Sequence, residues 1–144
     1  MGAAAAIANY PGFSVYGGSK AGMELACEAL AAEVAPLGIR VTVVIPGPFR
    51  TAFVRRSVDR AAGAVEAYAG TSGKFASLIT GMDGKQPGDP DRAAEVILQI
   101  SEAEKPPFRL VLGTYATNKA KRQLEQRRAE LEQWEAVGKP TEFR

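Results

Sequence analysis

Residues 11–22 read PGFSVYGGSKAG and place Tyr16 and Lys20 four positions apart. Small and apolar residues recur at helical spacing from there onward, and the breakers at residues 36–38 end the pattern. We therefore expect one helix over residues 14–35. Positions i and i+4 of a helix lie one turn apart on the same face, so this helix should bring the phenol and the amine together.

A tyrosine beside a lysine has a chemical use. A free phenol has a pKa of about 10 and is a poor acid or base at neutral pH. A nearby cation favours the phenolate and lowers that pKa, so the tyrosine can donate a proton to a carbonyl oxygen or accept one from an alcohol. The same spacing also occurs on helices by chance, and alone it leaves a structural role open.

The run IRVTVVI at residues 39–45 is short, β-branched and almost continuously apolar. This pattern predicts a strand buried on both faces, as in a parallel sheet covered by helices. The turn PGPFRT at residues 46–51 follows it. Open α/β sheets bind ligands beyond the carboxyl ends of their strands, so this turn and the Thr51 hydroxyl are candidate ligand contacts. The alternative is a turn that only ends the strand.

The rest of the chain predicts three more helices and one more strand. We expect a helix over residues 58–68, followed by a glycine-rich stretch that runs to Gly88. Asp89 as N-cap and Pro90 as first helical residue predict a helix that runs to about residue 104.

Residues 109–113 predict a second buried strand, and residues 116–137 predict a last helix with Trp134 as its packing anchor. Two strands alone make a marginal sheet. The chain therefore reads as part of a larger α/β sheet with helices on its faces.

Composition narrows the class of protein. The 144 residues suffice for one domain, and the net charge of +2 is too small to indicate a nucleic-acid partner. No apolar run approaches the ~20 residues of a membrane span. With no histidine and only Cys27, neither a metal site nor an internal disulfide is expected, which fits a cytoplasmic protein. The apolar start at residues 1–8 has no basic residues before it, and we expect it to be the end of a buried strand or a loop just after one.

Four segments together resemble the short-chain dehydrogenase/reductase family. Residues 11–22 resemble its active-site segment, and residues 35–47 resemble the helix end and strand that follow. Residues 88–90 and 109–113 are similar to its C-terminal region. The resemblance implies a partial doubly wound, Rossmann-like α/β fold. Residues 1–144 would then be a single partial domain, the C-terminal half, with few parallel strands flanked by helices.

The resemblance also implies residue roles. Tyr16 matches the family's catalytic acid/base, and Lys20 matches the lysine that lowers the tyrosine pKa and binds the nicotinamide ribose. Pro46, Gly47 and Thr51 match the segment that contacts the nicotinamide. The cofactor implied is NADP or NAD, and the substrate is a small carbonyl or alcohol compound.

The variable stretch at residues 53–82 matches the family's substrate loop. Within it Phe53, Phe75, Leu78 and Ile79 are candidates for an apolar wall. Packing of these side chains in a core would explain them equally well.

The chain departs from the family in two places. Where the family has a serine thirteen positions before the tyrosine, this sequence has Ala3, which has no hydrogen-bond donor. The glycine-rich turn that holds the pyrophosphate is also missing from the sequence. We therefore expect a truncated oxidoreductase that lacks the dinucleotide-binding half and is weakly active or inactive alone.

The resemblance also bears on whether the chain associates with other subunits. In the family, the helix that carries the tyrosine also packs against a second subunit, and Ala21, Ala29 and Ala32 leave room for such contact. A homo-oligomer, or association with a full-length relative, is therefore expected. The competing hypothesis is a non-catalytic assembly or decoy partner of such a relative. Acidic residues interleave with the basic ones on the last helix, which argues against nucleic-acid binding.

Overall fold

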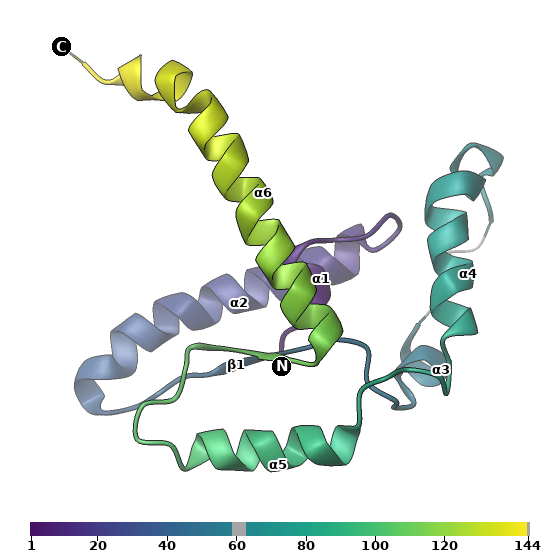
Figure 1. Cartoon of the computed structure of the whole chain (residues 1–144), viewed down its shortest axis with the longest axis horizontal. Helices are drawn as coiled ribbons and strands as arrows, with labels where there is room; N and C mark the ends of the chain where they lie inside the picture. Colours follow the sequence, from purple (N-terminus) through teal and green to yellow (C-terminus); the bar gives the residue numbers. More distant parts are fainter. Residues whose placement is uncertain (59–62, 144) are drawn as a thin grey trace.

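The structure is a computed structural model that describes residues 1–58 and 63–143. Figure 1 shows a small sheet with helices around it. In chain order the described elements are α1 (Ala4–Ile7), α2 (Ser14–Val34), η1 (Ala35–Leu37), β1 (Val43–Pro46), α3 (Phe53–Ser57), η2 (Glu66–Tyr68), η3 (Ala69–Gly73), α4 (Lys74–Gly81), α5 (Pro90–Ser101), β2 (Arg109–Leu112), α6 (Thr114–Gly138) and η4 (Lys139–Thr141). Among these described helices, none has the length and apolar character that crossing a bilayer demands.

The sheet pairs β1 and β2 in parallel, with Val43 opposite Arg109. The first residues of the chain lie along β1, because the Gly2 amide donates to the Val44 carbonyl at 2.7 Å. The prediction that residues 1–8 end a buried strand or form a loop just after one is nevertheless wrong for residues 4–7, because they form helix α1. The mixed α/β arrangement confirms the predicted fold class.

Strand β1 is shorter than predicted, because residues 39–42 do not pair. Extending the register backward would bring Arg40 opposite Pro106 and Val41 opposite Pro107. Proline has no backbone N–H and cannot donate to a ladder. The Thr42 hydroxyl instead donates to the Pro107 carbonyl at 2.8 Å.

Burial of the strands is also less complete than predicted. Val43 and Ile45 are buried, whereas Val44 and Pro46 are only half-buried and Arg109 is exposed. One face of β1 is therefore fully covered in this structure and the other is not. The expectation of burial on both faces is wrong for the described part of the chain.

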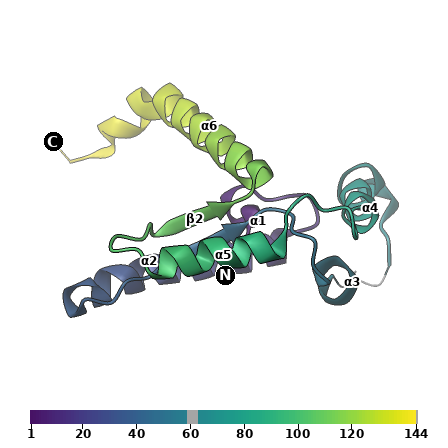
Figure 2. The same ribbon diagram turned by 60° about the horizontal axis from the view of Figure 1, so that its bottom comes forward.

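Helices α2 and α5 run along the sheet (Figures 1 and 2). Helix α2 confirms the predicted helix, and Arg109 of β2 holds it through ion pairs with Glu24 at 2.6 Å and with Glu28. Helix α5 begins as predicted, because the Asp89 carboxylate accepts from the amides of Asp91 and Arg92.

Helix α6 packs on the sheet only through its first turns. Ala116 is completely buried, whereas Leu124, Leu131 and Trp134 are largely exposed. Figure 1 shows the helix leaving the body, with the C-terminus at its far end. The prediction that Trp134 anchors this helix by packing is wrong, because the helix has left the sheet before it reaches that residue.

The predicted helix over residues 58–68 is not formed in the described residues. Gly63 has a φ of 89°, outside the helical region, and only Glu66–Tyr68 forms a short 3₁₀ turn. Residues 59–62 lie outside the described part of the chain. The glycine-rich stretch instead contains α4, a helix that the sequence reading missed.

The two adjacent glycines of α2 should respond oppositely to alanine. Gly17 is buried, and an added Cβ would overlap the side-chain amide of Asn9, whereas nothing lies within 4 Å of such an atom at Gly18. We expect Gly18→Ala to raise the free energy of unfolding by about 0.5–1 kcal/mol. Gly17→Ala should lower it by about 1–3 kcal/mol, as overpacking does.

Denaturant titrations of the two variants test this pair, each serving as the other's control. Equal changes of the free energy of unfolding in the same direction would contradict the packing of Asn9 against Gly17.

Candidate active site

A cavity of about 780 Å³ lies at the carboxyl ends of β1 and β2, with Pro46, Gly47 and Leu112 in its lining. All five residues that the sequence singles out for chemistry and cofactor contact line it, namely Tyr16, Lys20, Pro46, Gly47 and Thr51. Segments up to 35 positions apart in the sequence therefore meet at one place. The roles of these residues stay predictions.

The turn before α2 sets the position of Tyr16. The Asn9 side chain accepts from the Tyr10 amide at 2.9 Å and donates to the Phe13 carbonyl at 3.1 Å. Gly12 has a φ of 81°, a conformation that glycine adopts readily. The turn therefore ends in a fixed geometry, and the tyrosine lies in the first turn of the helix.

Tyr16 sits among aromatic rings. Its ring centroid lies 5.3 Å from that of Phe13 and 5.7 Å from that of Phe53. Burial in this environment raises the pKa of the Tyr16 phenol above its ordinary value. The phenol is therefore protonated at neutral pH.

Lys20 lies beside Tyr16 but does not tune it in this structure. The Lys20 Nζ is 5.8 Å from the ring centroid and donates to the Met1 carbonyl at 3.3 Å. The predicted lowering of the phenol pKa is therefore not found, because desolvation dominates and the ammonium is bonded elsewhere. An ammonium has three donors, so two remain for a ligand.

The loop after β1 is held against β2 and α6. The Gly47 amide donates to the Leu112 carbonyl at 3.0 Å, and a Cβ on Gly47 would lie 3.3 Å from that of Ala116. The Thr51 hydroxyl oxygen accepts from the Phe53 amide at 3.3 Å. Among the described residues no side chain or carbonyl accepts the proton of this hydroxyl, which suits a contact with a polar ring substituent of a ligand.

The proposed apolar wall also reaches the cavity. Phe53, Phe75, Leu78 and Ile79 all line it. Phe75 of α4 stacks on Tyr10 at 4.6 Å and meets Phe13 edge-on at 5.0 Å between ring centroids. The aromatic contacts thus tie α4 to the turn before α2.

Ala3 lines the same cavity. It is 6% exposed, with extended backbone angles, immediately before α1. The position where the resemblance expects a serine therefore lies in the lining of the same cavity as Tyr16, and its side chain is a methyl group.

Some residues of the region escaped the sequence reading. The hydroxyls of Tyr10 and Tyr115 share a hydrogen bond of 2.7 Å across 105 positions, and both residues line the cavity. Gln86 is almost fully buried at its edge, with no hydrogen-bond partner for either side-chain polar atom among the described residues. No local pattern in the sequence marks these three residues.

Comparison with known proteins identifies the family. The sequence model described as short chain dehydrogenase matches residues 1–62. A solved structure titled as a short-chain dehydrogenase from Streptomyces avermitilis superposes with a TM-score of 0.83 over 98% of this chain, at 38% sequence identity.

The chain belongs to the short-chain dehydrogenase/reductase family. This confirms the resemblance that the sequence motifs indicate. Two curated relatives agree with it. The oxidoreductase BOA17 of Botryotinia fuckeliana is 32% identical over 86% of this chain. The 3-ketodihydrosphingosine reductase of Bacteroides thetaiotaomicron is 34% identical over 72% of it.

The chain spans about half the length of the proteins it matches. It covers 45% of the Botryotinia relative, 38% of the Bacteroides relative and 50% of the Streptomyces chain. The cavity described above is therefore formed by a chain that corresponds to about half of a full-length family member. The activity of a full-length protein is considered below as a proposal.

Proposed function

We propose that this short-chain dehydrogenase/reductase chain takes part in NAD(P)-dependent interconversion of a carbonyl compound and its alcohol. The observation that supports this is the convergence of Tyr16, Lys20, Pro46, Gly47 and Thr51 on one cavity. A competing non-catalytic role is not favoured, because the relatives that the chain matches are named oxidoreductases and a reductase.

The donors in the cavity fit the nicotinamide end of a dinucleotide. The Lys20 ammonium has donors to spare for ribose hydroxyls, and the Thr51 hydroxyl has one for the carboxamide. When bound, the nicotinamide supplies or accepts a hydride. The sequence holds no glycine-rich phosphate turn, so the chain's own residues account for the nicotinamide side of the site only.

Tyr16 would handle the proton. As a hydride reaches a carbonyl carbon, negative charge grows on the oxygen, and a phenol within hydrogen-bond reach neutralises it by donating its proton. The alcohol product forms when that O–H bond is complete, and Tyr16 is left as a phenolate. Lys20 lies close enough to stabilise this anion electrostatically, which is the state in which its charge matters.

The substrate should carry an apolar group next to its carbonyl. The Phe53, Phe75 and Ile79 side chains line the same cavity as Tyr16 and offer no hydrogen bonds. The Bacteroides relative is named for the reduction of a keto compound, which supports the carbonyl as the reacting group.

Deuteride transfer tests the proposal. The chain would be incubated with NADPH or NADH labelled at C4 on either face, together with a panel of aryl and alkyl ketones, and the alcohols analysed by mass spectrometry. Deuterated alcohol that depends on the chain supports the proposal. Because the chain alone is expected to be weakly active, chain and cofactor are used in equal amounts. A chain that shifts the cofactor's fluorescence but even then transfers no deuterium to any ketone would refute the proposal.

The raised pKa of Tyr16 sets the pH dependence of this reaction. Reduction needs the protonated phenol, so its rate should stay flat from about pH 6 to about pH 9 and fall only above pH 10. Oxidation of the alcohol needs the phenolate, so the rate of oxidation should rise about tenfold per pH unit from about pH 6 to about pH 9. A reduction rate that already falls near neutral pH would show that the phenol pKa is lowered in the working site.

We also propose that α2 takes part in assembly. Leu25 and Leu30 of this helix are exposed, although both are large and apolar. Contact with a second copy, or with a longer relative, would cover them.

A further inference from the structure

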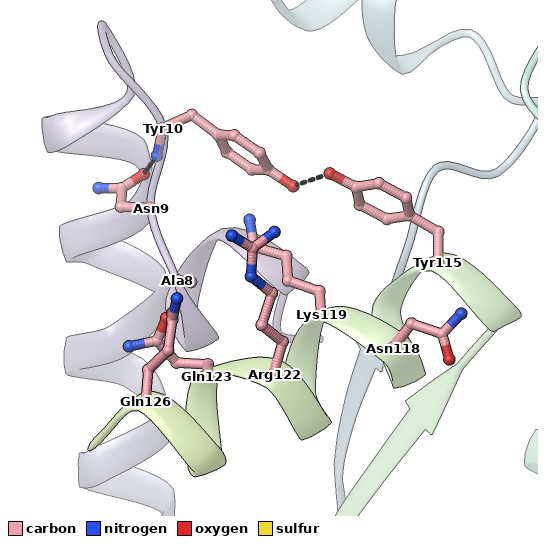
Figure 3. Close-up of a pocket in the computed structure, with 9 residues that line it drawn as sticks. All are labelled: Ala8, Asn9, Tyr10, Tyr115, Asn118, Lys119, Arg122, Gln123 and Gln126. Carbon is pink, nitrogen blue, oxygen red and sulfur yellow. Dashed lines mark hydrogen bonds between the residues drawn. The ribbon is translucent and has the colours of Figure 1, made fainter. Parts of the chain in front are cut away.

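A second, smaller pocket lies on the other side of the Tyr10–Tyr115 pair. Its volume is about 430 Å³, and α6 forms one wall while the segment before α2 forms the other (Figure 3). Its lining residues are Ala8, Asn9, Tyr10, Tyr115, Asn118, Lys119, Arg122, Gln123 and Gln126.

The lining of this pocket carries positive charge and many hydrogen-bond donors. Lys119 and Arg122 are both cationic, and the remaining polar side chains are amides and phenols. Within the described part of the chain, no aspartate or glutamate belongs to the lining. Farther along the chain two cations do have carboxylate partners, since Arg128 of α6 pairs with Glu132 and Lys139 of η4 pairs with Glu135.

Lys119 and Arg122 have no counter-ion among the described residues. Neither forms an ion pair there, and the buried Lys119 Nζ has no hydrogen-bond partner. The ammonium lies 3.2 Å from the centroid of the Tyr10 ring. Figure 3 shows the Lys119 and Arg122 side chains rising from α6 toward that ring.

Burying the Lys119 ammonium in this way is energetically unfavourable. A buried ammonium without a hydrogen-bonding partner loses solvation that one aromatic face only partly replaces. Desolvation accordingly lowers the pKa of the Lys119 amine to about 8. An anion in the pocket would satisfy the ammonium and the guanidinium together, and guanidinium groups suit carboxylate and phosphate oxygens.

The pocket adjoins the candidate active site. Tyr10 and Tyr115 line both spaces, so their hydrogen-bonded hydroxyls form the wall between them. A molecule whose carbonyl lies at Tyr16 would reach Lys119 only when this hydrogen bond opens or when the molecule passes beside the pair.

We propose that the pocket formed by Lys119 and Arg122 binds the anionic group, a carboxylate or a phosphate, of the substrate. The link to the substrate rests on the function proposed above, whereas the anion site itself does not. The substrate class is thus a carbonyl compound with an apolar middle and an acidic end.

Anion binding is tested first without any turnover. Inorganic phosphate and acetate would be titrated separately into ¹⁵N-labelled chain, with the amide resonances of residues 118–126 as the readout. We expect saturable shifts there with at least one of the two anions, and the tighter one identifies the preferred group. Neutral ethyl acetate should cause no such shifts.

Charge-matched variants on the same helix make the test specific. Lys119→Met and Arg122→Gln should each weaken binding about tenfold or more, as the loss of a charged hydrogen bond does. Lys121→Met removes the same charge from an exposed position outside the lining and should leave binding unchanged. Because Arg122 is exposed, its variant should fold even if the Lys119 variant does not.

No saturable shifts with either anion, or equal loss of binding in the Lys121 variant, would overturn the anion site. The link to the substrate has its own readout. Deuteride transfer would be compared for a series of ω-oxo carboxylic acids and their methyl esters. A lower KM for the acids that disappears in Arg122→Gln supports the link, and equal KM values for acid and ester would overturn it. Anion binding without any deuteride transfer would refute the proposed function and leave the anion site standing.

Discussion

Replacing Tyr16 by phenylalanine is expected to lower the rate of deuteride transfer from labelled NADPH to a ketone by about 100- to 10,000-fold, the usual contribution of a positioned acid. The substitution removes one hydroxyl and keeps the ring that contacts Phe13 and Phe53. Binding of the cofactor should change little, so the loss should appear in the rate at saturating cofactor.

A phenylalanine at Tyr68 is the matched control. Tyr68 lies in η2 and is 62% exposed, and it does not line the cavity. Tyr68→Phe should transfer deuteride at the rate of the unaltered chain. Loss of less than about tenfold in Tyr16→Phe would mean that another group delivers the proton.

Replacing Ala3 by serine should have the opposite effect and raise the rate of reduction by about 100-fold, the scale of a single donor to a developing oxyanion. Ala3 is buried at the cavity, and its extended backbone accepts a serine without strain. The new hydroxyl would face the space beside Tyr16 and donate to the carbonyl oxygen as negative charge grows there.

Ala6→Ser is the control for this gain, because Ala6 lies in α1 and does not line the cavity. It should leave the rate unchanged. The double variant Ala3→Ser with Tyr16→Phe separates the two roles. We expect it to remain slow, since a donor to the oxygen does not replace the proton source. A serine at Ala3 without effect would mean that this position does not face the reacting oxygen.

The sequence predicted the parts of the fold that depend on local chemistry. Helix α2 follows from its apolar and small residues, and the start of α5 follows from Asp89 as N-cap. The strand predicted over residues 39–45 begins too early, because the partner strand decides where pairing begins. Pro106 and Pro107 supply no donors, a fact that becomes visible only once the register is known.

Packing between distant segments was beyond the reach of local patterns. The apolar residues of α6 gave no sign that the helix leaves the sheet after its first turns. The predicted lowering of the Tyr16 pKa is wrong for a related reason. The spacing to Lys20 is visible in the sequence, but the desolvation that outweighs it comes from rings on other elements.

Of the candidate site, too, only the part that local motifs mark could be predicted from the sequence. The five residues that the family motif supplies do meet at one cavity. The Tyr10–Tyr115 hydrogen bond and the Lys119 contact with Tyr10 join positions more than 100 residues apart. Only the folded chain brings such pairs together, and the pocket they form has no counterpart in the linear sequence.

The most direct test of the central claim is where nicotinamide binds. Nicotinamide riboside carries the reactive ring and the ribose but no phosphate, so it avoids the pocket at Lys119. Titrated into ¹⁵N-labelled chain, it should shift the amide resonances of Lys20, Gly47 and Thr51 and give nuclear Overhauser contacts from its ring protons to the Thr51 methyl group. Shifts confined to other parts of the chain, or none at millimolar riboside, would contradict the assignment of this cavity as the nicotinamide site.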